Sequence, residues 1–181
     1  MLIHAHRSQL LVIDLQERLL PAIHDHERVV ANVLWLIRAA QRIGVPVAAV
    51  EQYAKGLGST VKTVGELLPA GAIAQKTHFS GVAAQCLAPL PGSDRTQIVL
   101  IGTEAHVCLL QTALELLEEG KEIYVVADAV GSRRELDRDL ALARMRQEGA
   151  RIVSREMVVF EWLGEAGTPL FREINREFLR G

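Results

Sequence analysis

The stretch TQIVLIGTEAHVCLLQTALELLEEGKEIYVVAD, residues 96–128, contains the pattern that decides the fold. It opens with the apolar run 96–102 and closes with the apolar run 122–128, and both are rich in the β-branched residues that favour strands. Between the runs, apolar residues recur at the spacing of one helix face, at Val107, Leu110, Leu114 and Leu117. Gly120 then ends the helix. The order of strand, helix and strand predicts one parallel βαβ unit.

The same alternation extends along the rest of the chain. Further strands are expected at 9–14, 46–51, 72–76 and 150–154. Helices are expected at 28–43, 80–90, 135–148 and 168–179, the third with Leu136, Leu140 and Ala143 facing inward, and a loop is expected at 51–63. Because the strands are apolar on both faces, the predicted fold class is α/β, with three layers (α/β/α) around a central six-stranded, mostly parallel, Rossmann-like sheet. We expect one domain over residues 1–181.

Composition argues against several classes of protein. With 49% hydrophobic and 23% charged residues, the 181-residue chain can bury a sizeable core. The net charge of −2 and the 4% aromatic residues do not favour a nucleic-acid partner. The longest apolar runs are strand-sized and no signal peptide is recognised, so we expect no membrane span. Two cysteines do not make a disulfide framework, and the expected location is the reducing cytoplasm.

Three side chains of chemical interest follow predicted strands. Asp14 ends the first strand, Lys76 ends the third, and Cys108 follows the fourth. Because parallel strands end at the same edge of a sheet, where such folds bind ligands, we expect all three at one edge. Each also has a structural interpretation: Asp14 as a loop cap, Lys76 as a solvated lysine and Cys108 as a small buried hydrophobe. Their coincidence at one edge favours a functional site.

An acid, an ammonium group and a thiol together support nucleophilic chemistry. The start of a helix and the ammonium of Lys76 both favour a thiolate at Cys108. Asp14 can accept the thiol proton and later return it to a leaving amine, and backbone N–H groups at the helix start can hold an oxyanion. A Cys–His pair with His106 is the alternative, but two residues apart on a turn the side chains need not face each other.

At these residues the chain resembles the isochorismatase-like cysteine hydrolases, the superfamily that includes nicotinamidases and N-carbamoylsarcosine amidohydrolase. Three separated pieces carry the resemblance: VIDLQ with Asp14, QKTHFS with Lys76, and IGTEAHVCLLQTA with Cys108. Their order also matches, so the resemblance spans almost the whole domain. The third piece is the most specific. Together with EQYAKGLG it indicates the branch of isochorismatase-domain proteins whose substrates are mostly unassigned.

The resemblance implies a catalytic role for each of the three residues. Cys108 would attack a carbonyl carbon and form a thioester, Asp14 would transfer protons, and Lys76 would stabilise the thiolate and orient Asp14. The resemblance also implies a cis peptide bond at Thr103–Glu104, which would direct the N–H of Glu104 toward an oxyanion beside the N–H of Cys108. Most relatives self-associate, so a homo-oligomer is implied as well.

The sequence departs from the nicotinamidases at their metal site. They carry Asp-x-His after the second strand, whereas this chain has Glu51, Gln52 and Tyr53, and it has no histidine between His26 and His78. The six histidines show no metal-binding spacing. We therefore expect neither a metal nor a cofactor, and nicotinamide is a doubtful substrate.

Other residues are candidates by position for binding a small-molecule substrate, with loop packing as the alternative: Gln16, Gln52, Tyr53, His78, Phe79 and His106. Cys86 lies in an apolar stretch and is expected in the core. Phe160, Trp162 and Leu163 concentrate apolar side chains without a clear core period. They form either an interface patch between subunits, which could close a neighbour's pocket, or packing within the monomer.

Three functions stay open on the sequence alone. The favoured one is a cysteine hydrolase that cleaves an amide or ureido-like C–N bond of a small molecule. An isochorismate-type vinyl ether hydrolase would share the fold but need no cysteine. A binding or scaffold protein would keep the three residues as a relic, with an unreactive thiol. A redox role is less favoured, because Cys86 and Cys108 lack CxxC spacing.

Overall fold

The computed structural model describes residues 1–179 and contains a six-stranded sheet. Its strands are all parallel and lie in the order β3-β2-β1-β4-β5-β6. The bounds are β1 Ser8–Ile13, β2 Val47–Gln52, β3 Ile73–Lys76, β4 Gln97–Thr103, β5 Glu122–Gly131 and β6 Arg151–Val153. Every strand expected from the sequence is present, and the predicted α/β class is confirmed.

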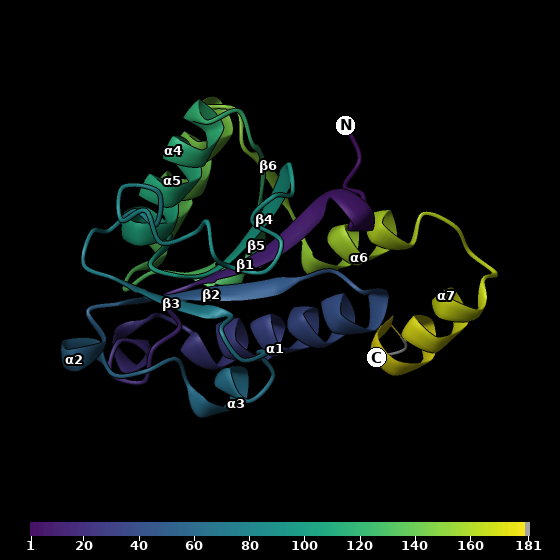
Figure 1. Ribbon diagram of the computed structural model, residues 1–181, viewed down its shortest axis with the longest axis horizontal. Coiled ribbons are helices and arrows are strands. Elements are labelled where there is room, and N and C mark those ends of the chain that lie inside the picture. Colours follow the sequence, from purple (N-terminus) through teal and green to yellow (C-terminus); the bar gives the residue numbers. More distant parts are fainter. Residues whose placement is uncertain (180–181) are drawn as a thin grey trace.

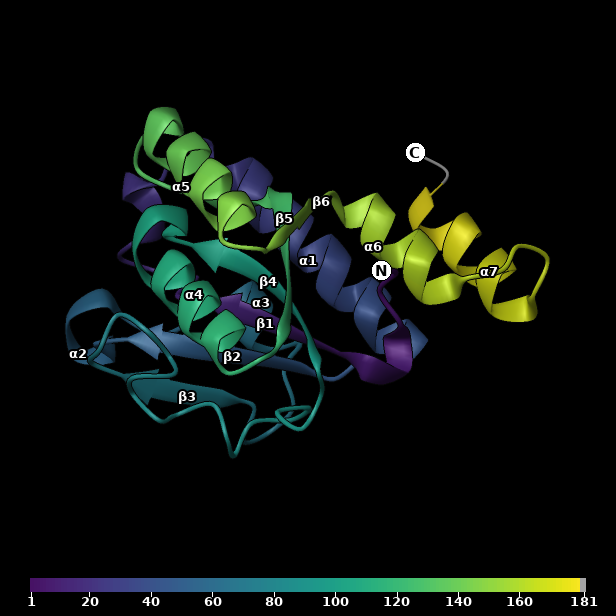
Figure 2. The ribbon, with the colours of Figure 1, turned by 90° about the horizontal axis from the view of Figure 1, so that it is seen from above.

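Helices cover both faces of this sheet and give the molecule three layers (Figures 1 and 2). One face is covered by α1 (His26–Ile43) and α6 (Arg155–Leu163), and the other by α4 (Leu110–Glu118) and α5 (Glu135–Gln147). The helix α7 (Pro169–Ile174) lies beyond the sheet and packs against α1. Each face has its own cluster of buried apolar side chains. The strands are therefore apolar along nearly their whole length, because neither face meets water.

The winding of the chain reverses between β1 and β4. From β1 the chain winds outward to β2 and β3, then crosses back to β4 and winds outward to β5 and β6. Doubly wound sheets bind ligands at such a switch point, outside the carboxyl ends of the strands. The segments that leave β1 and β4 at this point begin with Asp14 and Glu104.

The orientation predicted for α5 is wrong. Leu136 and Leu140, expected to face inward, are 67% and 60% exposed, and Ala143 is exposed as well. The buried residues of this helix are Ala141, Leu142 and Met145. The helix carries apolar side chains on two faces, and tertiary packing, which sequence spacing does not report, selects between them.

The helix that follows β4 begins with a π turn, Ala105–Leu109, before α4 starts. A π turn inserts an extra residue into the regular repeat, so it rotates the face that follows. Of the four residues predicted on the inner face only Leu110 is fully buried, and the others are half-buried: Val107, Leu114 and Leu117. Further along α4 the buried positions fall one residue earlier, at Ala113 and Leu116.

The segment 80–90, predicted as a short helix, contains turns and no helix. The hydroxyl of Ser80 accepts hydrogen bonds from the backbone N–H groups two and three residues later, which competes with helical bonding. Gln85 has a left-handed φ of 53°, which no α-helix accommodates. Cys86, expected in the core, is only half-buried at the margin of the apolar cluster under α4.

Two further segments differ in detail from expectation. The stretch 51–63, expected to be a loop, contains the short helix α2 (Ala54–Leu57) and the start of α3 (Lys62–Gly65). The last helix, expected at 168–179, is α7 followed by a π turn at Asn175–Leu179. Within residues 1–179, none of the helices is long and apolar enough to cross a membrane.

The apolar segment in α6 packs mainly within the monomer. Trp162 is buried, and its Nε1 donates to Oγ of Ser8 at 3.0 Å. Leu163 is half-buried, whereas Phe160 is 47% exposed. Of the three residues considered for an interface patch, only Phe160 presents much apolar surface.

Candidate active site

A buried ion pair lies at the carboxyl edge of the sheet. The Nζ atom of Lys76, at the end of β3, lies 2.9 Å from Oδ2 of Asp14, which follows β1. Both side chains are fully buried, with 0% of their surface exposed. Since β2 separates β1 from β3, the lysine side chain spans the end of β2 to reach the carboxylate. Folding thus joins two residues that are 62 positions apart.

A sharp backbone turn directs Asp14 toward this pair. Alternation along β1 sends Leu10 and Val12 into the cluster under α1, and Asp14 would follow them. Its φ of 45° instead lies in the left-handed region, which non-glycine residues seldom adopt and which is enriched at functional sites. The hydroxyl of Thr103 donates to the carbonyl of Asp14 at 2.7 Å and holds the turn in place.

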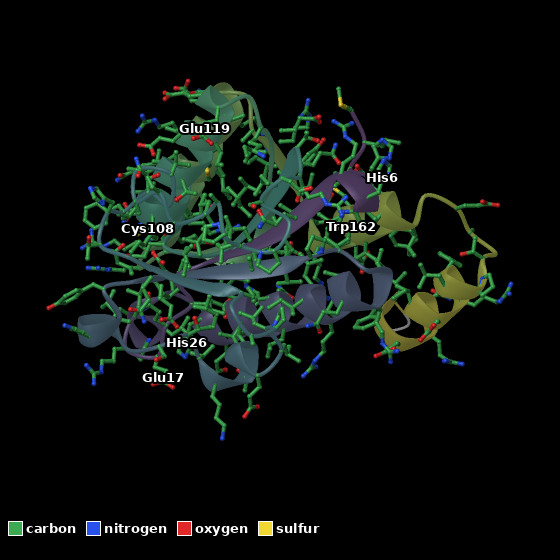
Figure 3. The ribbon with its side chains drawn as sticks, viewed as in Figure 1. His6, Glu17, His26, Cys108, Glu119 and Trp162 are labelled. Carbon is green, nitrogen blue, oxygen red and sulfur yellow. The ribbon has the colours of Figure 1, made fainter. Side chains whose placement is uncertain are left out.

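Cys108 lies in the π turn between β4 and α4 and is 5% exposed (Figure 3). Its thiol is close enough to both Asp14 and Lys76 for each to alter its pKa. Within residues 1–179, Oδ1 of Asp14 lies in hydrogen-bonding geometry with no N–H or O–H donor. The carboxylate can therefore accept the proton of the Cys108 thiol. The three residues expected at one sheet edge are therefore neighbours. Single π turns are frequent at functional sites.

The protonation of the thiol is governed chiefly by burial. Burial raises the pKa of the Cys108 thiol far above its usual value, the carboxylate of Asp14 raises it further, and Lys76 opposes both. Burial also raises the pKa of Asp14, against the lowering effect of Lys76. These shifts favour a protonated thiol over the thiolate that the helix start and Lys76 would favour. Burial removes water from the sulfur, and the sequence pattern does not report that loss.

The chain just before the π turn is held rigidly. The peptide bond between Thr103 and Glu104 is cis, at the position that the resemblance implied. Gly102 precedes it with a φ of 110°, and a Cβ there would lie 2.2 Å from the carbonyl oxygen of Ile13, so only glycine fits this close approach of β4 to β1. Oε1 of the buried Glu104 lies 2.8 Å from Nε of Arg133, a residue that the sequence did not single out.

Two glutamines considered for substrate binding are occupied by contacts within the protein. Oε1 of Gln52 accepts from Nζ of Lys76 at 2.8 Å, and its Nε2 donates to the carbonyl of Thr77 at 2.7 Å. Gln16 accepts from the backbone N–H of Gln52 at 2.7 Å and donates to the carbonyls of Gln52 and Gly58. Gln52 therefore orients the ammonium group, and Gln16 orients the strand end that carries Gln52.

Three other candidates, Tyr53, His78 and Phe79, lie at the surface beside the end of β3. An open pocket of about 470 Å³ is lined here by Tyr53, Ala54, Lys55, Gln75, Lys76, Thr77, His78 and Ala84. Tyr53 and Phe79 are 56% and 53% exposed. The pocket thus lies beside Lys76, and neither Asp14 nor Cys108 is in its lining.

His106 is directed to another partner. Its Nδ1 lies 3.0 Å from Oγ of Ser132, a buried residue just after β5. The groups that affect the thiol of Cys108 are Asp14 and Lys76. The contacts therefore support the Asp–Lys–Cys arrangement over a Cys–His pair. Nothing in the sequence pattern distinguishes Ser132 from an ordinary loop serine.

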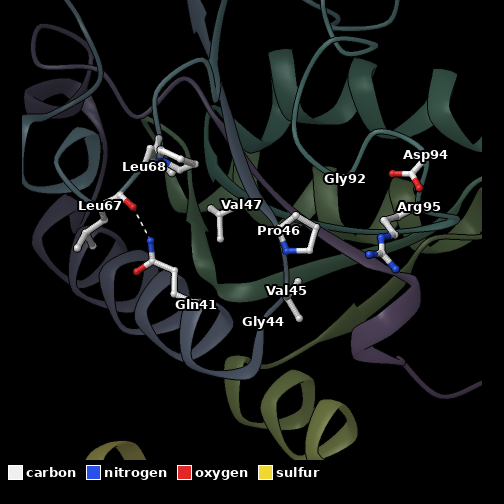
Figure 4. A pocket seen from close by; sticks show the side chains of 11 residues that line it. Gln41, Gly44, Val45, Pro46, Val47, Leu67, Leu68, Gly92, Asp94 and Arg95 are labelled. Atoms are coloured by element: carbon white, nitrogen blue, oxygen red, sulfur yellow. Dashed lines mark hydrogen bonds between the residues drawn. The ribbon is translucent and has the colours of Figure 1, made fainter.

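A larger pocket, of about 590 Å³, lies at the opposite edge of the sheet (Figure 4). It is lined mainly by residues of the segments 44–47, 67–69 and 92–95, which precede or begin strands or belong to the connection before β3. It includes Asp94 and Arg95 but none of the candidate site residues. Within residues 1–179, no group of three or more His, Cys, Asp or Glu side chains is placed to hold a metal ion.

Comparison with known proteins agrees with this fold. The isochorismatase domain matches residues 8–157. Isochorismatase domain-containing protein 2 of Danio rerio is 39% identical over 93% of this chain and 85% of its own length. Isochorismatase domain-containing protein 1 of Salmo salar is 41% identical over 90% of this chain, but this chain covers only 57% of that relative.

A solved structure shows the same fold. The structure described as the MAR1 ribonuclease of Caenorhabditis elegans superposes with a TM-score of 0.88 at 36% identity, over 100% of this chain and 94% of that chain. The domain match covers most of the chain, and these relatives are similar over most of its length. The chain belongs to the isochorismatase family of hydrolases.

Proposed function

We propose that this protein is a cysteine hydrolase that cleaves an amide or ureido-like C–N bond of a small molecule through a thioester on Cys108. The observation that carries the proposal is the state of the Asp14 carboxylate. One oxygen is paired with Lys76 at 2.9 Å, and the buried carboxylate lies within hydrogen-bonding reach of the thiol of Cys108. A buried carboxylate beside a thiol can take up the thiol proton when the sulfur attacks.

In the proposed reaction the thiol proton passes to Oδ1 of Asp14 as Sγ of Cys108 attacks the carbonyl carbon. The carbonyl electron pair moves to oxygen, where the N–H groups of Glu104 and Cys108 hold the oxyanion. Collapse of the tetrahedral intermediate breaks the C–N bond, and Asp14 returns the proton to the leaving nitrogen. Water, deprotonated by Asp14, then hydrolyses the thioester, which releases a carboxylic acid and restores the thiol.

The shifted pKa values support this order of events. Because the pKa of Cys108 is raised, the thiol keeps its proton until a carbonyl group is present to attack. Because the pKa of Asp14 is raised as well, its carboxylate is a stronger base than an exposed aspartate. Lys76, held by Asp14 and Gln52, offsets the negative charge that moves between oxygen and sulfur.

The substrate is proposed to be small and to enter from the pocket beside Lys76. Cys108 is only 5% exposed, so a bulky group would not reach the sulfur without a rearrangement. Tyr53 and His78 line the pocket and are the proposed substrate contacts, and Phe79 follows His78 in sequence.

The test is a screen of small amides and ureido compounds for ammonia release, combined with the mass of the intact protein during turnover. The expected result is turnover with a transient acyl group that maps to Cys108. Cys108→Ala should reduce turnover by at least about 1,000-fold, as the loss of a nucleophile does in hydrolases of this kind, while Cys86→Ala should retain it. Undiminished amide hydrolysis by Cys108→Ala would exclude the thioester route.

Isochorismate-type vinyl ether hydrolysis is the second candidate, because the matched domain is an isochorismatase domain. That reaction needs no thiol. With isochorismate as substrate, Cys108→Ala should then retain activity, whereas amide hydrolysis should be lost. The same variant therefore separates the two reactions.

RNA cleavage is a third candidate, carried by the description of the 36% identical structure as a ribonuclease. The geometry favours it less, because Asp14 and Lys76 are sealed from solvent and the net charge of −2 does not attract a polyanion. We expect no cleavage of a single-stranded RNA. Cleavage that disappears in Cys108→Ala and Asp14→Asn would replace amide hydrolysis as the assignment.

We further propose that the protein acts in the cytoplasm as a homo-oligomer. Both cysteines are free, as expected in a reducing compartment. The exposed side chains of Leu136, Leu140 and Phe160 offer apolar surface for contacts between copies. Light scattering of the purified protein should give a mass above that of one chain.

A further inference from the structure

The segment that follows Lys76 is fastened to the helix that follows Cys108. Residues 77–93 form bends and turns without a helix or strand. Ser80 and Gly81, near the start of this segment, hydrogen-bond to Glu115 and Thr112, which lie one turn apart on α4. These four residues, Ser80, Gly81, Thr112 and Glu115, are called the clamp below.

Thr112 joins the segment to Cys108 itself. Its hydroxyl accepts from the N–H of Gly81 at 3.0 Å and donates to the carbonyl of Cys108 at 2.7 Å. Thr112 is 0% exposed, so water cannot replace either bond. Removal of the hydroxyl would leave two buried backbone groups without this partner.

Glu115 supplies the second half of the clamp. Its Oε2 accepts from Oγ of Ser80 at 2.5 Å and from the N–H of Ala83 at 3.0 Å. Ser80 is 2% exposed, and hydrogen bonds to a carboxylate are stronger than those between neutral groups. The proposed hydrolytic chemistry does not use Glu115.

The clamp connects the two reactive groups by short routes. Ser80 follows Lys76 by four residues, and Thr112 follows Cys108 by four. Lys76 needs such a connection because β3 is an edge strand of four residues that pairs only with β2. Asp14 and Gln52 fix the ammonium group, but the clamp fixes the adjacent chain against α4.

We propose that Thr112 and Glu115 are positioning residues that set the placement of Lys76 relative to the thiol of Cys108. The inference rests on the proposed function, in which Lys76 offsets the charge that develops on sulfur. Loosening the clamp moves the ammonium away from the sulfur, so less thiolate forms at a given pH.

The test is the rate at which Cys108 is alkylated by iodoacetamide between about pH 7 and 9, a range below the thiol pKa in which the rate follows the thiolate fraction. Peptide mapping reads Cys108 separately from Cys86, whose thiol contacts the carbonyl of Gly81 and is best left unchanged. Glu115→Ala and Thr112→Val should each slow the reaction by about three- to tenfold, the effect of one lost hydrogen bond. Thr112→Ser, which keeps the hydroxyl, should react at the parent rate.

Glu118→Ala, at an exposed position of the same helix, is the matched control and should also react at the parent rate. Parent-like rates in Glu115→Ala and Thr112→Val would overturn the inference. So would faster alkylation that favours the larger reagent N-ethylmaleimide, because the clamp would then only restrict access. Glu115→Ala keeps the test available if Thr112→Val fails to fold.

Lys76→Met, tested alongside, separates the two proposals. If Lys76→Met slows alkylation while the clamp variants do not, only the positioning role fails. If Lys76→Met also reacts at the parent rate, the role of Lys76 in the proposed function fails too.

Discussion

The two edges of the sheet differ in the volume of their pockets and in the interactions that fix the residues around them. The amino edge has an open pocket of about 590 Å³, beside which Gln41 makes an exposed hydrogen bond to the carbonyl of Leu67 (Figure 4). The carboxyl edge has a smaller pocket of about 470 Å³ beside Lys76 and little free space at Cys108, but it holds a fully buried ion pair. The comparison teaches that the larger pocket does not identify the candidate active site in this fold. The buried, paired charges of Asp14 and Lys76 identify it instead.

The largest expected difference between the edges is in stability. Lys76→Met leaves the Asp14 carboxylate buried without its partner, which should lower the free energy of unfolding by about 3–5 kcal/mol. Arg95→Met at the amino edge should cost less than about 1 kcal/mol, because Arg95 makes no ion pair within the described residues. Urea unfolding measures both, and equal losses would remove the distinction between the edges.

A pair of glycines extends the same comparison to the backbone. Gly102, at the carboxyl edge, has no room for a Cβ. Gly120, before β5 at the amino edge, has a φ of 82°, and a Cβ added there would have no neighbouring atom within 4 Å. Gly120→Ala should cost about 1–2 kcal/mol from the left-handed conformation alone. Gly102→Ala adds the clash with Ile13 and should cost at least about 1 kcal/mol more. Thermal unfolding of both variants checks this order, and an equal loss would mean that β4 can move away from β1.

Alkaline pH should reveal how much the buried, protonated thiol contributes to stability. The pKa of Cys108 is raised in the folded state, so its contribution to stability is fully present below the ordinary thiol pKa and is lost as pH rises above it. From about pH 9 upward the natural protein should lose up to about 1.4 kcal/mol per pH unit relative to Cys108→Ala. Urea unfolding at about pH 8 and pH 10 measures the difference. Parallel pH profiles would show that the thiol is not desolvated.

The smallest effect is expected at the rim of the site. Arg133 is 62% exposed, so its ion pair with Glu104 is partly screened by solvent. Arg133→Met should therefore lower the free energy of unfolding by no more than about 1 kcal/mol, again by urea unfolding. A loss as large as that of Lys76→Met would mean that the carboxyl edge is held together from its rim and not from its interior.

Much of the scaffold could be predicted from the sequence because it depends on local patterns. The apolar runs around Val12 and Leu100 gave strands, and the strand ends gave the edge at which Asp14, Lys76 and Cys108 are placed. The features that failed depend on tertiary packing. The outward face of Leu140 follows from which side of α5 meets the sheet, and spacing alone does not contain that information.

The site itself was predicted less completely, for similar reasons. The raised pKa of Cys108 depends on how fully folding removes water from the sulfur, and composition does not report this. Gln16 and Gln52 are candidates for substrate contact by position alone, and their amides bind the backbone and Lys76 instead. Thr112 and Glu115 look like ordinary residues of an amphipathic helix until the segment that they bind is placed against them.

The central claim is that Asp14, Lys76 and Cys108 form one reactive unit, and the pH dependence of Cys108 alkylation in Asp14→Asn and Lys76→Met tests it most directly. The carboxylate raises the pKa of the thiol and the ammonium lowers it. The account therefore predicts opposite results below the thiol pKa: faster alkylation than in the natural protein for Asp14→Asn, and slower alkylation for Lys76→Met. Two folded variants that both react at the natural rate would contradict it and show three buried residues without a shared function.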